Sequence, residues 1–164
     1  MADFTIARLD PAEVDRAEPL WNALREHHEL TLPELGPARS REESWGMRRS
    51  RYAEWLTEPS AFALIATTSD GRDVGYCVVT DLGAETTFAN DRVGCLETIA
   101  VHPDARRLGV GSALLTEARR QAAHEGLPEL TITVFSGNAS ALGFYAHHGF
   151  VEYLKVLRAP NPAG

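Results

Sequence analysis

The sequence lacks the features that place a protein in a membrane or in an oxidising compartment. Its longest uninterrupted apolar run, AFALIA, is far too short to span a bilayer. The N-terminal MADFTIARLD has no basic stretch followed by an apolar core, which predicts no signal peptide. Two cysteines, Cys77 and Cys95, are too few for a disulfide framework. These absences together predict a cytoplasmic protein that does not associate with a membrane.

Positive charge is also in short supply. The 164 residues carry 16 Lys and Arg against 23 Asp and Glu, for a formal net charge of -7. General nucleic-acid binding requires a basic face, so this balance argues against a nucleic-acid partner. An acidic protein that binds an anion must instead concentrate its positive field locally. The length favours one domain with a single core, and we expect it to cover residues 1–158.

Motifs for metal binding are missing as well. Two adjacent histidine pairs, His27–His28 and His147–His148, lie in segments with helical patterns. Neighbouring side chains on a helix diverge by about 100°, so such a pair does not chelate one ion. Neither HExxH nor a Cys/His ligand spacing occurs, and we predict no metal.

Helical and strand periodicities succeed one another along the whole chain. Capping patterns at Asp10, Ser40 and Asn138 predict helix starts, and Pro19 predicts a break in the first helix. Helices are expected from Asp10 onward, over 40–56, over 109–125 and over 138–148, and strands over 4–9, 61–67, 74–82, 93–101, 129–135 and 150–157. Loops are expected at 31–39 and 83–92, and a flexible tail at 159–164. A hairpin followed by a strand–helix–strand unit predicts an α/β fold with a mixed sheet flanked by helices.

The segment ARRLGVGSALL combines cations with bare backbone at the start of a helix. Gly109 and Gly111 let a ligand approach the main chain, and the first helical N–H groups favour an anion. Arg106 and Arg107 add donors suited to phosphate. A Walker A loop requires Gly-Lys-Ser/Thr, and a dinucleotide fingerprint requires Gly or Ala where Leu114 stands, so neither applies. A plain surface loop with a helix cap remains the alternative.

With its surroundings, this segment resembles the GNAT superfamily of N-acetyltransferases. The family signature Arg/Gln-x-x-Gly-x-Gly/Ala reads here as Arg106, Gly109 and Gly111. It follows a strand that ends in a Val-x-Pro-like segment, here Val101, His102 and Pro103. A second family segment, Asn-x-x-Ala-x-x-x-Tyr-x-x-x-Gly-Phe, matches in full, at Asn138, Ala141, Tyr145, Gly149 and Phe150. The match is strongest over residues 93–151. Arg107 stands where the family commonly has glycine.

The resemblance implies a fold and a cofactor site. The fold would be a central mixed sheet of about six to seven strands, with a bulge that splays the two middle strands, 93–101 and 129–135. The anion would be the pyrophosphate of acetyl-CoA, and the pantetheine arm would pair with the strand edge. The residues implied in cofactor binding are Ile99, Ala100, Val101, Arg106, Arg107, Leu108, Gly109, Val110, Gly111, Ser112, Asn138 and Tyr145.

Acetyl transfer to an amine requires a base and an acid. Glu97 is the candidate base, because a carboxylate in the apolar stretch GCLETIAV is costly to bury and the family often has an acid there. The alternatives are a Glu that faces solvent or pairs with an arginine such as Arg92. Tyr145 is the candidate acid near the CoA sulfur, or else a core residue beside Leu142. Asn138 would bind the pantetheine arm, cap a helix, or do both.

Other candidates have more ordinary interpretations. His102 is a candidate proton relay but is better explained as a loop residue, and Cys95 lacks a His partner motif for covalent catalysis. The arginines at 41, 48, 49 and 51 are typical of a solvated helix face. Trp45, Tyr52 and Trp55 are more typical of a core than of a substrate cage.

These observations predict an acetyl-CoA-dependent N-acetyltransferase that transfers acetyl directly to a primary amine of a small molecule or protein. The acidic balance favours a cationic acceptor, and a homodimer is possible. One alternative is a non-catalytic acyl-CoA-binding or sensing domain. Another is an unrelated nucleotide-binding module, which would bind ATP or NAD without a pantetheine arm.

Overall fold

A computed structural model describes residues 3–84 and 92–159. The chain divides into two units, Met1–Thr133 and Val134–Gly164. The first unit contains the sheet with α1, α2 and α3, and the second contains α4. Most of the loop expected at 83–92 and nearly all of the tail expected at 159–164 lie outside the described residues. The expectation of one domain over 1–158 stays a prediction.

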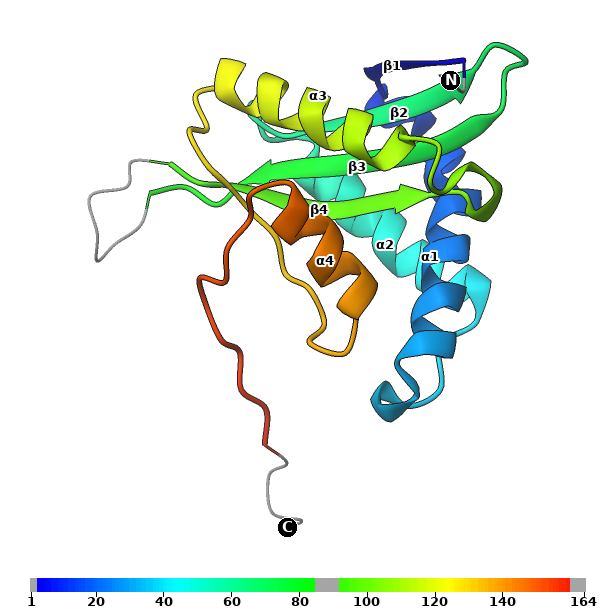
Figure 1. The fold of residues 1–164 in the computed structure, drawn as a ribbon. Coiled ribbons are helices and arrows are strands. Elements are labelled where there is room, and N and C mark those ends of the chain that lie inside the picture. Colours follow the sequence, from blue (N-terminus) through cyan, green and yellow to red (C-terminus); the bar gives the residue numbers. More distant parts are fainter. Residues whose placement is uncertain (1–2, 85–91, 160–164) are drawn as a thin grey trace. The chain divides into compact units, whose positions relative to one another are not determined.

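The sheet of the first unit is mixed, as its sequence pattern predicts (Figure 1). Its strands stand in the order β1-β2-β3-β4-β5, which is also their order along the chain. Neighbours are antiparallel except for β4 and β5, which are parallel. The bounds are β1 Phe4–Arg8, β2 Phe62–Thr68, β3 Asp73–Asp81, β4 Gly94–Val101 and β5 Leu130–Thr131.

The expectation of six to seven strands is wrong, because the described residues form a sheet of five. The strand expected over 129–135 is only β5, two residues long, and the segment expected as a strand over 150–157 contains no strand. Both segments have strand-like composition. A strand exists only where a neighbour completes its hydrogen bonds, and composition does not supply that neighbour.

The helices begin where the capping patterns predict. Asp10 accepts a hydrogen bond from the Ala12 amide at 2.8 Å, and Ser40 accepts one from the Glu43 amide at 3.2 Å. The first helical stretch does break near Pro19, where a 3-10 helix gives way to an α-helix. The bounds are η1 Pro11–Ala17, α1 Glu18–Thr31, η2 Pro33–Leu35, α2 Arg41–Trp55, η3 Pro103–Ala105, α3 Val110–His124 and α4 Ala139–His147.

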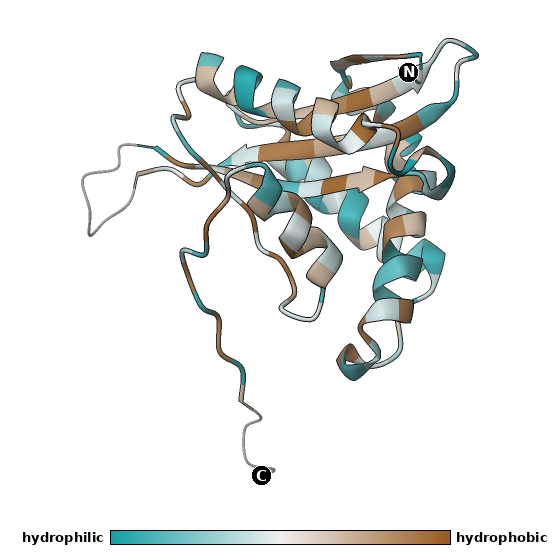
Figure 2. Cartoon of the chain, in the orientation of Figure 1, coloured by the Kyte–Doolittle hydropathy of each residue, from teal (hydrophilic) through white to brown (hydrophobic). Residues whose placement is uncertain are grey.

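Helices cover the two faces of the sheet in the first unit (Figure 1). On one face, η1, α1 and α2 pack on β2, β3 and β4 around a cluster that includes Leu20, Tyr52 and Tyr76. On the other face α3 lies so close that a Cβ atom at Gly75 would come within 2.9 Å of Leu114. The strands are accordingly apolar along most of their length, as Figure 2 shows.

Candidate functional site

The ladder between β3 and β4 contains one extra residue, and that residue is Glu97. Val78 stands opposite Thr98, but the next residue, Val79, stands opposite Leu96. Two residues facing one partner make a β-bulge, which re-aims side chains and often lies beside an active site. The family resemblance implied such a bulge without showing its position, and the register places it at the candidate base.

The ladder between β4 and β5 is short. Only Gly94 and Cys95 of β4 pair with β5, opposite Leu130 and Thr131. Beyond Cys95, β4 continues to Val101 without a β5 partner among the described residues of the first unit. The expected splaying of the two middle strands stays a prediction.

A hydrogen bond holds the Glu97 carboxylate. The Thr80 hydroxyl on β3 donates to Oε1 of Glu97 at 2.8 Å, and Thr80 is 6% exposed. The expected alternative partner, Arg92, is engaged elsewhere. Its Nε donates to Oδ2 of Asp81 at 2.9 Å and its Nη1 to the carbonyl of Glu125 at 3.1 Å. The pairing of Glu97 with Arg92 is therefore excluded in this structure.

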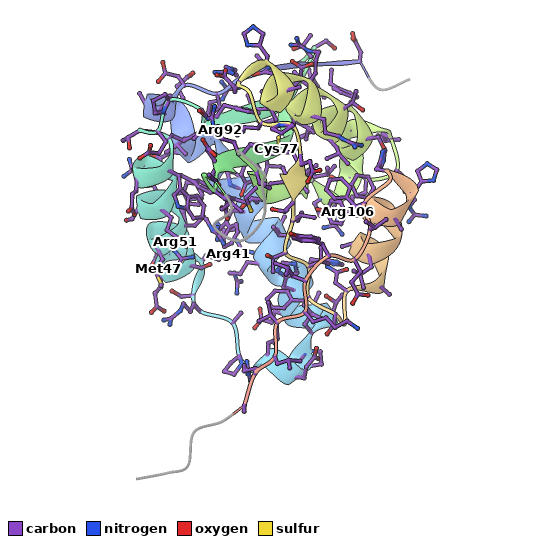
Figure 3. The ribbon with its side chains drawn as sticks, turned by 90° about the vertical axis from the view of Figure 1, so that its left-hand side faces the viewer. Arg41, Met47, Arg51, Cys77, Arg92 and Arg106 are labelled. Carbon is purple, nitrogen blue, oxygen red and sulfur yellow. The ribbon has the colours of Figure 1, made fainter. Side chains whose placement is uncertain are left out.

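The Cys95 thiol lies near the same carboxylate. Burial, followed by the negative charge of Glu97, raises the pKa of the Cys95 thiol to about 12. Burial raises the pKa of Cys77, on β3, to about 12 as well (Figure 3). With pKa values this high, both cysteines stay protonated at neutral pH. Because only a thiolate is an effective nucleophile, both are unreactive. A protonated Cys95, which also lacks a His partner motif, is not suited to covalent catalysis.

A buried cluster of hydroxyl groups lies next to Glu97, and no sequence pattern predicts it. Tyr52 Oη donates to Thr98 Oγ1 at 2.8 Å and lies 3.0 Å from Tyr76 Oη. Tyr52 and Tyr76 are fully buried, and burial raises the pKa of each. The cluster joins α2 to β3 and to the residue after Glu97. The position of Tyr52 on the apolar stripe of a helix does not reveal that its hydroxyl forms hydrogen bonds with residues of β3 and β4.

The aromatic residues of α2 belong to the core or pack against it. Trp45 is buried and packs edge-on against Tyr52, with ring centroids 6.1 Å apart, so both are core residues. Trp55 is partly buried and packs against the same cluster. Figure 3 shows Arg41, Met47 and Arg51 along the same helix.

The start of α3 has the backbone of an anion site. Gly109 is the N-cap residue with φ +87°, and no side chain caps the helix. The first helical hydrogen bond runs from the Ala113 amide to the Gly109 carbonyl, so the amides of Val110 and Gly111 precede the helical ladder. A Cβ atom at Gly109 would meet nothing within 4 Å. The main chain is therefore open to a ligand at this point.

Two arginines flank this helix start. Arg107 adopts φ +62°, a left-handed conformation that non-glycine residues seldom take. Arg106 Nε lies 3.4 Å from the carbonyl of Val101. The pKa of His27 on α1 is lowered, mainly by burial and secondly by the positive charge of Arg106. Leu108, between the arginine pair and the glycine, is exposed, and Ser112 in the first turn is partly buried.

The end of β4 leads directly into that helix start. Ile99 and Val101 are partly buried and Ala100 is buried. His102 then accepts a hydrogen bond from the Asp104 amide at 3.3 Å and so caps η3, which fits its interpretation as a loop residue. Residues 97, 99–101 and 106–112, all predicted for the site, thus lie on one continuous strand–turn–helix segment.

The remaining predicted residues lie in the second unit. Asn138 caps α4 by accepting a hydrogen bond from the Ala141 amide at 3.1 Å. Tyr145 is buried, with ring contacts to Phe144 and Phe150 at 5.2 and 5.5 Å, whereas Leu142 is exposed. The approach of these two residues to the cofactor stays a prediction.

Within residues 3–84 and 92–159, no cluster of three or more His, Cys, Asp or Glu side chains could hold a metal ion. Among the helices described there, none has both the length and the apolarity to cross a membrane.

Comparison with known proteins decides the family. The model of the acetyltransferase (GNAT) family matches residues 21–150. The chain belongs to the GNAT acetyltransferase family. The match runs from within α1 to just beyond the end of α4 and includes both motifs that carry the resemblance.

Relatives of this GNAT chain include mycothiol acetyltransferases. The one from Thermomonospora curvata is 26% identical over 160 residues, covering 96% of this chain and 48% of that protein. The one from Acidimicrobium ferrooxidans is 31% identical over 102 residues, covering 62% of this chain and 31% of that protein. This chain therefore spans a third to a half of the length of these curated relatives.

Solved structures show the same GNAT fold at low identity. A mutant of the BH1408 protein from Bacillus halodurans has a TM-score of 0.79 at 15% identity, covering 96% of this chain and 99% of that one. Aminoglycoside N-acetyltransferase AAC(6')-Iy, solved in complex with CoA, has a TM-score of 0.72 at 18% identity, covering 99% and 97%.

Proposed function

We propose that this chain is an acetyl-CoA-dependent N-acetyltransferase that transfers the acetyl group directly to a primary amine. The observation that carries the proposal is the position of Glu97. A bulge in β4 turns this carboxylate toward Thr80 of the neighbouring strand β3. β4 itself leads into the open, arginine-flanked start of α3. Membership of the GNAT family supports the assignment.

The start of α3 fits the diphosphate of coenzyme A. Amides that precede the helical ladder, and the positive end of the helix dipole, favour an anion, and Arg106 and Arg107 supply further donors. Residues 106–112 would hold the diphosphate, and the edge formed by residues 99–101 would pair with the pantetheine arm. AAC(6')-Iy, a protein of similar fold, has been solved with CoA.

Glu97 would remove the proton that blocks attack by the amine. At a pKa near 10.4, about one lysine-like amine in 2,500 is neutral at pH 7, a penalty of roughly 4 to 5 kcal/mol. Glu97 would accept the ammonium proton directly or through a water molecule. The two thiols stay protonated, so neither is suited to carry the acetyl group, and this favours direct transfer.

The second unit would supply the acid. In this proposal Tyr145 Oη gives its proton to the departing CoA sulfur, and Asn138 binds the pantetheine arm while it caps α4. A backbone amide within residues 99–101 would donate to the acetyl oxygen as negative charge develops there.

Titration calorimetry with acetyl-CoA, CoA, ATP and NAD tests the cofactor, and a thiol-release assay over an amine panel tests the reaction. We expect acetyl-CoA and CoA to bind and ATP and NAD not to. A non-catalytic domain would bind CoA without release of thiol, and preference for ATP or NAD would contradict the cofactor assignment. Glu97→Gln should lower turnover at least 10-fold, whereas Glu54→Gln, on the exposed face of α2, should not.

A further inference from the structure

Arg48 of α2 is surrounded by aromatic rings. Its guanidinium carbon lies 4.2 Å from the ring centroid of Trp21 on α1, and 5.6 and 5.9 Å from those of Tyr52 and Trp55 on α2. Trp21 is itself anchored, because its Nε1 donates to Ser44 Oγ at 3.0 Å. The guanidinium is therefore held between two helices in a defined place.

Among the residues that the structure describes, the guanidinium has no oxygen partner. Two other arginines of α2 have one: Arg41 pairs with Glu26, and Arg49 pairs with Asp15 at 2.6 Å. Within the described parts of the chain, Arg48 donates to no carboxylate, carbonyl or hydroxyl, although it is partly buried. Ring faces attract the positive charge but do not accept the in-plane N–H groups. In the described structure no Arg48 nitrogen is sealed from solvent without a partner, so its N–H groups remain accessible to an incoming anion.

Arg48 also lies on the face of the sheet that the Glu97 side chain reaches. Tyr52 links the two, because its ring faces Arg48 while its hydroxyl donates to Thr98, the residue after Glu97. Both charges act on the Tyr52 hydroxyl: burial raises the pKa of Tyr52 most, Arg48 opposes the rise, and Glu97 adds to it. Arg48, which pairs with no acidic side chain in the described parts of the chain, and the candidate base Glu97 therefore both act on one tyrosine.

We propose that Arg48 binds a carboxylate or phosphate group of the acceptor, so that the acceptor is a primary amine that also carries an anion. This inference rests on the proposed N-acetyltransferase function. The amine would lie at Glu97 and the anion at Arg48, with the acceptor alongside Tyr52. The local charge therefore points away from the cationic acceptor that the net charge of -7 favours.

Matched acceptor pairs test the proposal. One arm compares ω-amino carboxylates of several lengths with their carboxamides, and the other compares 2-aminoethyl phosphate with ethanolamine. For the wild type we expect kcat/KM to be at least 10-fold higher for the anionic member of the better arm, and the arm that shows this identifies the anion. In Arg48→Met, which keeps an apolar stem, the anionic member should lose about 100-fold and the neutral member less than 3-fold.

Arg51→Met is the matched control, since Arg51 is an exposed arginine of the same helix with no ring stacked on it in the described structure. It should leave both acceptors unchanged. If Arg48 served only to hold α1 and α2 together, Arg48→Met would lower the melting temperature and reduce kcat/KM equally for both members of a pair. That result, or a wild-type preference for the neutral members, would overturn the proposal.

A binding measurement keeps this proposal separate from the proposed function. Tryptophan fluorescence is titrated with an N-acetyl-ω-amino carboxylate and its carboxamide, in wild type and in Arg48→Met. Saturable binding of the carboxylate by the wild type alone supports the anion site even if no amine is acetylated. Equal binding by both proteins overturns the anion site even if acetyl-CoA is consumed. The phosphate arm is followed in the same way with N-acetyl-2-aminoethyl phosphate.

Discussion

Thr80 donates a hydrogen bond from Oγ1 to Oε1 of Glu97 at 2.8 Å, across the ladder at the point where β4 has its extra residue. Thr80 stands opposite Cys95 and alternates with Tyr76 and Val78, so it faces the α1 and α2 side of the sheet. Thr98 faces that side too, because it bonds with Tyr52. Adjacent residues Glu97 and Thr98 therefore both reach the same face, which a regular strand does not allow.

Loss of the Thr80 hydroxyl should impair the placement of Glu97. A hydrogen bond to a charged group contributes about 1.5–3 kcal/mol, so Thr80→Val should lower kcat by roughly 10-fold or more. KM for acetyl-CoA should change little, because the Thr80 hydroxyl bonds Glu97 and Thr80 stands opposite Cys95 rather than residues 99–101. Thr80→Ser keeps the hydroxyl and should recover most of kcat. Steady-state kinetics compare kcat of the two variants. Equal kcat values for Thr80→Val and Thr80→Ser would contradict the positioning role.

Removal of the Tyr145 hydroxyl should slow the departure of the thiolate. Tyr145→Phe keeps the ring contacts with Phe144 and Phe150 and removes only the proton donor. General-acid catalysis is typically worth 10²–10⁴-fold, and we expect turnover to fall by about 10²-fold. Acetyl-CoA affinity, measured by calorimetry, should stay nearly unchanged. Unaltered turnover would remove Tyr145 from the mechanism.

A carboxylate introduced at the start of α3 should block the cofactor without harming the fold. Gly111→Glu adds bulk and negative charge where the diphosphate would lie, and acetyl-CoA affinity should fall at least ~100-fold. Acidic residues near a helix N-terminus are favourable, so the melting temperature should change little. Gly46→Glu is the control, because a Cβ atom at Gly46 on α2 meets nothing within 4 Å. Normal acetyl-CoA affinity in Gly111→Glu would refute the anion site.

The backbone at Arg107 should be strained. A left-handed conformation costs a non-glycine residue roughly 1–2 kcal/mol, partly offset in a glycine variant by its more flexible unfolded chain. Arg107→Gly should therefore be more stable than Arg107→Ala by about 0.5–1 kcal/mol. Both lose the same cation, so both should bind acetyl-CoA equally well. Denaturant unfolding compares the two variants, and greater stability of the alanine variant would show that φ is not strained.

The acidity of Glu117 should be visible in the pH dependence of stability. Hydrogen bonds from Arg120 and Gln121, at 2.6 and 2.8 Å, lower the pKa of Glu117 from 4.5 to about 2. A carboxyl whose pKa falls on folding stabilises the protein above its unfolded pKa and loses that contribution as pH falls toward the folded value. The contribution is present at pH 7 and disappears between about pH 5 and pH 2.

Glu117→Gln should therefore reduce the free energy of unfolding at pH 7 by less than about 1 kcal/mol, because Arg120 is exposed and solvent screens the pair. Urea unfolding at pH 7, 5 and 3 should show the difference from wild type shrinking as pH falls. A difference that stayed constant over this range would mean that the ion pair does not stabilise the fold.

Much of the helical structure, and the backbone at the start of α3, could be predicted from local patterns. Asp10, Ser40 and Asn138 each bond a backbone amide two or three residues ahead, so their role depends only on residues nearby in the chain. Gly109 is similarly local, since its φ of +87° suits glycine in any surroundings.

The tertiary structure alone decided the features that position the Glu97 side chain. The bulge at Glu97, the donor at Thr80 and the two-residue length of β5 all depend on which strands meet and in what register. The expected alternative partner of Glu97, Arg92, meets Asp81 instead for the same reason. A cap forms within one helical turn, where the chain itself brings donor and acceptor together. A strand register is set by the packing of whole faces between residues far apart in the chain, and that information lies in no short segment.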